Sequence, residues 1–339
     1  IINECMPWVE QYRCFASGTE ADMAAIRVAR TYTDKPKIIK MGGAYHGWSD
    51  QLVYSLHIPY TKTFEAHGIP KECTGHTTEC YPGDIESLRQ ALVANEKEGG
   101  TAAVILEPIG PESGTRMMPY DYCAKARELC DEFGTLLIFD EVVSAFRVGP
   151  GGAAGYFGVI PDLTVFGKIV SGGFPMAGGV GGSEDIMSSM AAGVKAGRKR
   201  AYVGGTLTAN PLSCAAGYYA IKEIVEQDAA KKAGENGDKL TAGIQGLIDQ
   251  YELPFVVWNT GSIVHFEVSG VMYLSVTDPE IFTKIPQRQH HIEQFGAALT
   301  ANGVITLAGS RIYTSMADND DTIAETLAAF DEVFKNIER

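Results

Sequence analysis

The chain has 339 residues, 45% hydrophobic and 21% charged, enough apolar material for one large core and a smaller one. Its formal net charge of −14 gives a surface that repels nucleic acid and anionic membranes, so binding to either is excluded. The sequence contains neither an apolar run of the ~20 residues that a membrane span needs nor a signal-peptide pattern. Seven scattered cysteines without zinc-site spacing predict reduced thiols, no metal site and a cytoplasmic location.

The first two-thirds of the chain alternate short apolar runs with helical patterns. We expect strands at residues 12–16, 37–41, 102–107, 136–140 and 163–166, and helices at residues 20–32, 85–96 and 120–132. This alternation predicts an α/β fold with a mostly parallel sheet that is covered on both faces. In such sheets, ligand sites form at the carboxyl ends of the strands.

The character of the sequence changes near residue 232. Helices are expected at residues 231–250, 287–302 and 321–337, and strands at residues 255–258, 262–267, 304–307 and 311–315. We therefore predict a large domain over residues 1–231 and a smaller C-terminal α+β domain over residues 232–339. Residues 151–153, Gly-Gly-Ala, match no complete dinucleotide or P-loop fingerprint and are predicted to form a loop.

Four segments carry groups suited to chemistry. Ser17-Gly18-Thr19 opens a helix and can cradle a phosphate, Asp140 and Glu141 end an apolar strand, Lys168 ends another, and Thr206 follows two glycines. A lysine amine shielded from water is a usable nucleophile. Each segment also has a purely structural reading: a helix cap, solvated acids, a lysine that extends to solvent, or a turn. Their occurrence in this order in one α/β chain makes the chemical reading the stronger one.

In this order the sequence resembles the class III aminotransferases, which have the fold-type-I architecture of enzymes that use pyridoxal 5′-phosphate (PLP). The matching strings are Ser-Gly-Thr-Glu-Ala (17–21), Tyr-His-Gly (45–47), Glu-Pro (107–108), Phe-Asp-Glu-Val (139–142), Pro-Asp-Leu-Thr (161–164), Gly-Lys-Ile (167–169), Gly-Gly-Thr (204–206) and Asn-Pro-Leu-Ser (210–213). Phe-Arg-Val (146–148), Gly-Gly (151–152) and Tyr-Phe-Gly (156–158) bring it nearest to the glutamate-1-semialdehyde aminomutase-like branch. The resemblance implies a large domain with a mostly parallel, seven-stranded type of sheet.

The resemblance also implies roles for catalytic residues. Lys168 would hold PLP as a Schiff base and move a proton during amino transfer. Asp140 would pair with the pyridine nitrogen and keep it protonated, so that the ring accepts electrons. Tyr45 would stack on one ring face and Val142 would pack on the other.

Further cofactor contacts follow from the same resemblance. Gly18 and Thr19, with Ser17, would bind the phosphate, and Glu141 would lie near the phenolic edge of the cofactor. His46 is included among the cofactor-binding residues, with ordinary packing as the alternative. Thr206 would reach the phosphate of a neighbouring subunit, which implies a homodimer.

The cofactor residues are common to two reactions. A transaminase moves an amino group between separate donor and acceptor molecules, whereas an aminomutase such as glutamate-1-semialdehyde 2,1-aminomutase moves it within one molecule. The aminomutases carry a Gly-Ser-Gly lid after Tyr-His-Gly, and residues 51–70 contain none, which favours a transaminase with small-molecule donor and acceptor. Family members also carry many more residues before the phosphate cradle than the sixteen that precede Ser17, so an N-terminal segment is expected to be missing.

Substrate contacts are predicted more loosely. Arg311 or Arg147 could bind a substrate carboxylate through a guanidinium fork, with a structural ion pair as the alternative for each. Trp48, His57 and Tyr60 make the following loop aromatic, which suits a bulky substrate or ordinary loop packing. A dehydrogenase would require a Gly-x-Gly-x-x-Gly unit, which is absent, and a non-catalytic scaffold is disfavoured because Lys168 and Asp140 are both retained.

Overall fold

A computed structural model describes residues 1–63, 65–191, 199–268 and 281–337. The chain divides into two compact units, Ile1–Val225 and Glu226–Arg339. The sequence-based division between residues 231 and 232 falls inside the helix α10 (Ala229–Gln250), which belongs entirely to the second unit. None of the helices in the described ranges is long and apolar enough to cross a membrane.

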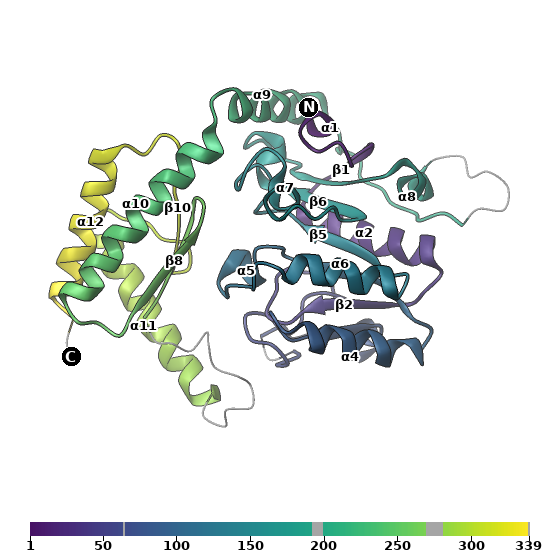
Figure 1. Ribbon diagram of the computed structural model, residues 1–339, viewed down its shortest axis with the longest axis horizontal. Coiled ribbons are helices and arrows are strands. Elements are labelled where there is room, and N and C mark those ends of the chain that lie inside the picture. Colours follow the sequence, from purple (N-terminus) through teal and green to yellow (C-terminus); the bar gives the residue numbers. More distant parts are fainter. Residues whose placement is uncertain (64, 192–198, 269–280, 338–339) are drawn as a thin grey trace. The chain divides into compact units, whose positions relative to one another are not determined.

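One sheet organises the first unit (Figure 1). Its strands are β1 (Gln11–Phe15), β2 (Lys37–Met41), β3 (Thr77–Cys80), β4 (Thr101–Leu106), β5 (Leu136–Asp140), β6 (Leu163–Gly167) and β7 (Gly178–Gly182). They follow the order β1-β7-β6-β5-β4-β2-β3. The pairs from β3 to β6 are parallel, and β7 runs antiparallel to both β6 and β1. The mostly parallel sheet that the sequence predicts is confirmed.

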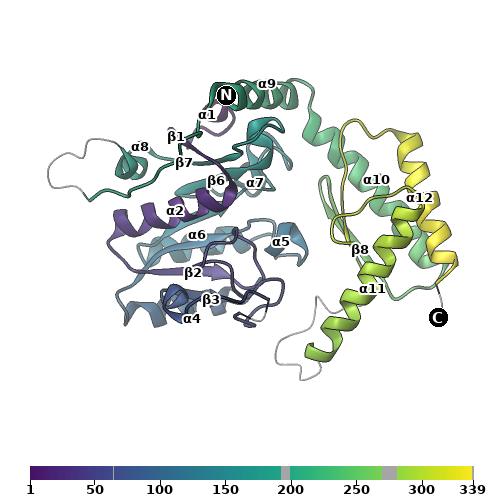
Figure 2. The ribbon, with the colours of Figure 1, turned by 180° about the vertical axis from the view of Figure 1, so that it is seen from behind.

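Helices cover both faces of this sheet, as Figures 1 and 2 show from opposite sides. On one face α2 (Gly18–Thr33) buries small and branched side chains against β4, β5 and β6. On the other face lie α4 (Ile85–Glu96) and α6 (Tyr122–Glu132), which pack on the alternate residues of β2, β4 and β5. The central strands are buried on both faces, so they are continuous apolar runs instead of alternating ones.

Further helices, most of them short, belong to the first unit. They are α1 (Ile2–Cys5), α3 (Lys71–Thr74), α5 (Pro111–Gly114), α7 (Gly152–Phe157), α8 (Glu184–Met187) and α9 (Pro211–Glu226), with 3₁₀ turns at Lys168–Ser171 and Ser188–Met190. The loop predicted at residues 151–153 is wrong, because α7 begins at Gly152, whose φ of +57° only a glycine adopts easily.

The second unit is an α+β layer with its own core. A three-stranded antiparallel sheet of β8 (Val256–Thr260), β9 (Ile263–Glu267) and β10 (Arg311–Tyr313) packs with the helices α10, α11 (Ile281–Ala301) and α12 (Asp320–Lys335). The strand predicted at residues 304–307 is wrong. Leu307 makes only an isolated bridge to Arg311, because the chain turns back at once through Gly309.

The strand order places four loops next to one another at the carboxyl edge of the first unit's sheet. Lys168 follows β6, Asp140 ends β5, Glu107 follows β4, and the loop with Tyr45 follows β2. These four strands are consecutive neighbours and parallel, so residues far apart in sequence meet at one edge.

Candidate functional site

Asp140 is held at the carboxyl end of β5 by two hydrogen bonds. Its Oδ2 lies 2.8 Å from Nδ1 of His46, and its Oδ1 accepts from the backbone N–H of Val142 at 3.0 Å. Both Asp140 and His46 are buried. Burial lowers the pKa of His46, and the hydrogen bond to Asp140 opposes this effect. A neutral imidazole that meets a carboxylate at Nδ1 carries its proton there, so His46 donates to Asp140 and leaves Nε2 as an acceptor.

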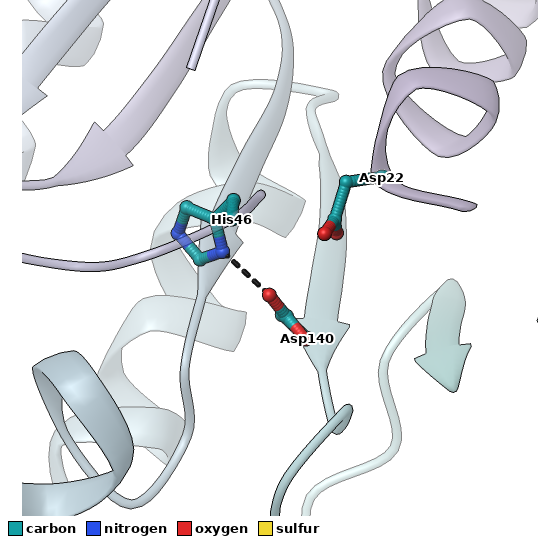
Figure 3. A group of neighbouring side chains, drawn as sticks. All are labelled: Asp22, His46 and Asp140. Atoms are coloured by element: carbon teal, nitrogen blue, oxygen red, sulfur yellow. Dashed lines mark hydrogen bonds and ion pairs between the residues drawn. The ribbon is translucent and has the colours of Figure 1, made fainter. Parts of the chain in front are cut away.

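Asp22 lies beside this pair and was not expected from the sequence. It projects from the first turns of α2, is buried, and its Oδ1 has no hydrogen-bond partner. Ligand-type atoms of Asp22, His46 and Asp140 all lie within 4.8 Å of one another (Figure 3). A sequence signal existed, because Asp22 shares the core-facing stripe of α2 with Ala25, Ile26 and Ala29.

Lys168 starts the turn after β6 in a left-handed conformation, with φ of +48°. A non-glycine residue in this region costs about 1–3 kcal/mol and is frequent at functional sites. The side chain is exposed, and its charge acts on the carboxyl group of Asp22, whose pKa it lowers against the stronger raising effect of burial. The lysine is therefore open to solvent and still close enough for its charge to act on the acidic cluster.

Val142 connects the lysine turn to the start of α2. A Cβ on Gly18 would lie 2.8 Å from Cγ2 of Val142, and one on Gly167 would lie 2.7 Å from Cγ1. Glycine at both positions lets the valine pack between the two backbone segments. The half-buried Val142 thus lies between the helix start and the end of β6, next to the lysine turn.

The start of α2 has the geometry of a capping box. Oγ of Ser17 accepts from the N–H of Glu20, and Oε2 of Glu20 accepts from the N–H of Ala16. The backbone of Gly47, with φ of +75°, approaches so closely that a Cβ there would lie 2.3 Å from Oγ1 of Thr19. The Tyr-His-Gly loop and the helix start therefore form one packed unit.

Glu107 anchors the Tyr45 loop from the neighbouring strand. Its carboxylate accepts from the N–H groups of Tyr45, Glu112 and Ser113, each at 2.8 Å. Burial, aided by the charge of Asp140, raises the pKa of Glu107 to about 8, and the three N–H donors oppose the shift. These bonds fix the backbone of Tyr45 while its ring stays 46% exposed.

Lys40 anchors the same loop from inside the sheet. The side chain is fully buried, and its Nζ donates to the carbonyls of Ala44, Leu52 and Tyr54 at 3.0, 2.9 and 2.7 Å. Burial lowers the pKa of Lys40 to about 8. Neither Lys40 nor Glu107 was assigned a role from the sequence, because a charged residue within an apolar run does not reveal which backbone groups it meets.

Glu141 does not take the position expected for it. Its carboxylate is fully buried and accepts from the N–H groups of Ala153 and Ala154 at the start of α7 and from the hydroxyl of Ser144. These bonds account for both oxygens, and burial raises the pKa of Glu141 to about 7. These partners give Glu141 a structural role at the start of α7, and its expected place near the phenolic edge of a cofactor stays a prediction.

The other predicted residues lie in several different segments of the chain. Thr206 lies exposed in a turn, and Arg147 is half-buried at the end of the turn, residues 142–147, that follows β5. Arg311 belongs to β10 of the second unit. Trp48 is exposed, and His57 is engaged by the carboxylates of Glu65 and Glu112, so packing accounts for that histidine.

The tyrosine of the aromatic loop is likewise engaged locally. The ring of Tyr60 stacks on Tyr81 with centroids 6.1 Å apart, and its hydroxyl lies 3.2 Å from that of Ser87. Ordinary loop packing therefore accounts for Tyr60.

Comparisons with known proteins agree with this geometry. The family model described as aminotransferase class-III matches residues 1–334. Two proteins named glutamate-1-semialdehyde 2,1-aminomutase are similar to this chain. The protein from Legionella pneumophila (strain Paris) is 40% identical over 78% of this chain and 60% of its own length. The protein named glutamate-1-semialdehyde 2,1-aminomutase 1 from Lachnoclostridium phytofermentans is 34% identical over 99% of this chain and 77% of its own length. The crystal structure of an omega-transaminase from Sphaerobacter thermophilus has a TM-score of 0.85 and 29% identity, covering 99% of this chain and 76% of that one.

The sheet order, with a lysine and an aspartate at the ends of adjacent parallel strands, is the fold-type-I architecture that PLP-dependent transaminases have. Within that class the chain belongs to the class III aminotransferase family. It spans 60 to 66% of the length of the Legionella relatives that it matches.

Proposed function

We propose that this protein is a PLP-dependent enzyme that moves amino groups between small molecules. The observation that carries the proposal is that Lys168 and Asp140 stand at the carboxyl ends of two adjacent parallel strands, β6 and β5. The start of α2 lies beside them. The surroundings also suit the cofactor: Gly18 at the start of α2 is only half-buried with Val142 packed beside it, and the ring of Tyr45 is half exposed on a fixed backbone. When bound, PLP supplies an electron sink for amino-acid chemistry.

The residues of the chain then have distinct tasks. The exposed amine of Lys168 anchors the cofactor and moves a proton at the reacting carbon of the substrate. Asp140 keeps a proton on the ring nitrogen, and His46 orients Asp140 through the 2.8 Å hydrogen bond. Tyr45 and Val142 cover the two ring faces. The free N–H groups of Gly18 and Thr19 at the helix start, with Ser17 as its cap, receive the phosphate.

Cofactor binding is tested by incubating the purified protein with PLP, reducing it with borohydride and mapping the modified peptide by mass spectrometry. We expect visible absorption of the bound cofactor and a label on Lys168. Lys168→Ala should lose the label, and Lys125→Ala, which changes an exposed lysine of α6, should retain it. A protein that takes up no PLP, or a label on another lysine, would overturn the proposal.

Between the two reactions, we propose transamination, because residues 51–70 lack the Gly-Ser-Gly lid expected of the aminomutases. Intramolecular transfer is the second candidate, supported by the names of the relatives that are 34 to 40% identical. Titration of the PLP-loaded protein with a panel of amino donors separates the two. Release of a keto product supports the transaminase, whereas isomerisation of glutamate-1-semialdehyde without release supports the aminomutase.

We keep Arg311 and Arg147 as proposed anchors for a substrate carboxylate, and Trp48 as a proposed contact for a bulky substrate. Arg311→Ala should raise the KM for amino acids that carry a carboxylate and leave the KM for simple amines unchanged. The same comparison for Arg147→Ala decides between the two arginines. Equal KM values for the variant and the parent protein would remove that arginine from the substrate site.

A homodimer is also part of the proposal. Several apolar residues before and after Thr206 in the sequence are exposed, among them Tyr202, Leu207, Leu212 and Tyr219. Contiguous exposed apolar residues are typical of protein interfaces, and a second copy would bring Thr206 to its neighbour's phosphate. Leu212→Glu should shift sedimentation from dimer to monomer, and a monomeric parent protein would contradict the idea.

The free state of all seven cysteines supports the cytoplasmic location that we also propose.

A further inference from the structure

The buried carboxyl group of Asp22 has no task in the function proposed above. Ionisable groups approach it from four segments: Asp140 from β5, Glu107 after β4, Lys168 after β6 and His46 in the loop after β2. The first two are acids, and the histidine is held neutral by burial. Lys168 is the basic group among these, and its side chain is exposed, so solvent screens its charge.

Two carboxyl groups this close in a water-poor site cannot both be ionised without a large cost. Atoms of Asp22 and Asp140 lie within 4.8 Å. Asp140 receives N–H donors on both oxygens, one from His46 and one from the backbone of Val142, which stabilises its anionic form. Oδ1 of Asp22 receives no donor although it is fully buried. The proton of the pair therefore belongs on Asp22.

We propose that Asp22 is a positioning residue that holds a proton beside Asp140 and so leaves Asp140 as the single anion of the Asp22–His46–Asp140 cluster (Figure 3). The inference rests on the proposed function, because the cation that this anion matches is the protonated ring nitrogen of PLP. With Asp22 and His46 both neutral, one negative charge meets one positive charge. An ionised Asp22 would leave a surplus negative charge buried behind the cofactor. The pKa of Asp22 is raised by burial first and by Asp140 and Glu107 next, which agrees with a neutral acid.

The charge state is measured directly by NMR on the PLP-loaded protein, labelled with ¹³C at the aspartate side-chain carboxyl. At neutral pH we expect one aspartate resonance at the chemical shift of a protonated acid, and its disappearance in Asp22→Asn. The resonance that is lost in Asp140→Asn should have the shift of a carboxylate. A carboxylate shift for Asp22 at neutral pH would overturn the proposal.

A second measurement uses the variants themselves. Asparagine is neutral and matches aspartic acid in shape, so Asp22→Asn should change the dissociation constant of PLP by less than about threefold if the acid is neutral. If Asp22 is an anion that helps to bind the ring, the same variant should weaken binding by about tenfold or more. Asp121→Asn, which changes an exposed acid at the start of α6, is the matched control and should bind as the parent does.

Failure of the proposed function and failure of the Asp22 proposal give different experimental results. If the parent protein binds no PLP, the proposed function fails, whatever the charge of Asp22. If the parent binds PLP but Asp22→Asn binds at least tenfold more weakly while circular dichroism shows it folded, the Asp22 proposal alone fails. Asp22→Ser, also neutral and smaller, gives the same comparison in case the asparagine variant does not fold.

Discussion

Replacing Lys40 by methionine tests how the Tyr45 loop is held. The change keeps the length of the side chain and leaves the carbonyls of Ala44, Leu52 and Tyr54 without their buried donor. Each buried acceptor without a partner costs about 1–3 kcal/mol, so the three together cost ~3–9 kcal/mol. The buried ammonium carries its own penalty: the fall of the Lys40 pKa from 10.5 to about 8 corresponds to about 3 kcal/mol, which the variant recovers. Loss of the hydrogen bonds outweighs this recovery, and we expect a net destabilisation of about 3 kcal/mol.

Thermal unfolding followed by calorimetry measures the effect. For a unit of this size, about 3 kcal/mol corresponds to a fall in Tm of ~6–12 °C. The amide hydrogen-exchange rate should increase most over that of the parent in peptides that cover residues 42–56, because the lost hydrogen bonds lie there. Lys125→Met, which removes only an exposed ion pair with Asp121, should change stability by less than about 0.5 kcal/mol. A Lys40→Met variant as stable as the parent, with unchanged exchange in this loop, would refute the reasoning.

Two further substitutions probe neighbouring contacts. Gly47→Ala places a Cβ where it would lie 2.3 Å from Oγ1 of Thr19, on a backbone with φ of +75°. We expect PLP affinity to fall about tenfold or more while the far-UV circular dichroism stays unchanged. Unaltered affinity would show that the helix start is not the phosphate site. His57 has its pKa raised to about 10 by hydrogen bonds with Glu112 and Glu65. A pKa raised above the unfolded value of 6.5 means that the stabilisation is complete below pH ~6.5 and is lost as the pH rises through about 10. His57→Gln should therefore destabilise the protein at acidic pH and lose this effect at high pH. The effect should be about 1 kcal/mol or less, because the side chain is 44% exposed. If urea unfolding gave the same difference in free energy of unfolding between variant and parent across this pH range, the role given to His57 would be wrong.

The parts of the fold that were predicted correctly have local causes. The strands that end at Asp140 and near Lys168 are buried on both faces, so they appear in the sequence as continuous apolar runs. The start of α2 is specified by a capping box within a few residues, Ser17 and Glu20. Such features need no knowledge of distant partners.

The parts that were missed depend on distant partners. The strand β7 is Gly-Gly-Val-Gly-Gly, which has almost no β propensity. Its glycines are explained only by what crosses them: a Cβ on Gly179 would lie 1.9 Å from the hydroxyl of Tyr12, and one on Gly178 would lie 2.2 Å from the carbonyl of Ser17. Only the folded sheet shows these approaches.

The different partners of Asp140 and Glu141 follow from a simpler rule. Successive residues along a strand point to opposite sides, and the side chains of Asp140 and Glu141 project in different directions in this way. Asp140 faces His46, and Glu141 accordingly turns to the start of α7. The alternation rule, applied to the sequence alone, would have separated the two acids.

The row of strand ends that carries Lys168, Asp140, Glu107 and Tyr45 has a consequence for how this protein can be assembled. None of these residues approaches another until β2, β4, β5 and β6 have paired in their final register, in which Leu106 lies opposite Phe139 and Asp140 opposite Val165. A shift of one residue in any of these pairings would turn a site residue to the other face of the sheet. Uptake of PLP during refolding should therefore be a late event that reports completion of the whole sheet, and a chain that has formed its helices but mispaired one strand would remain colourless.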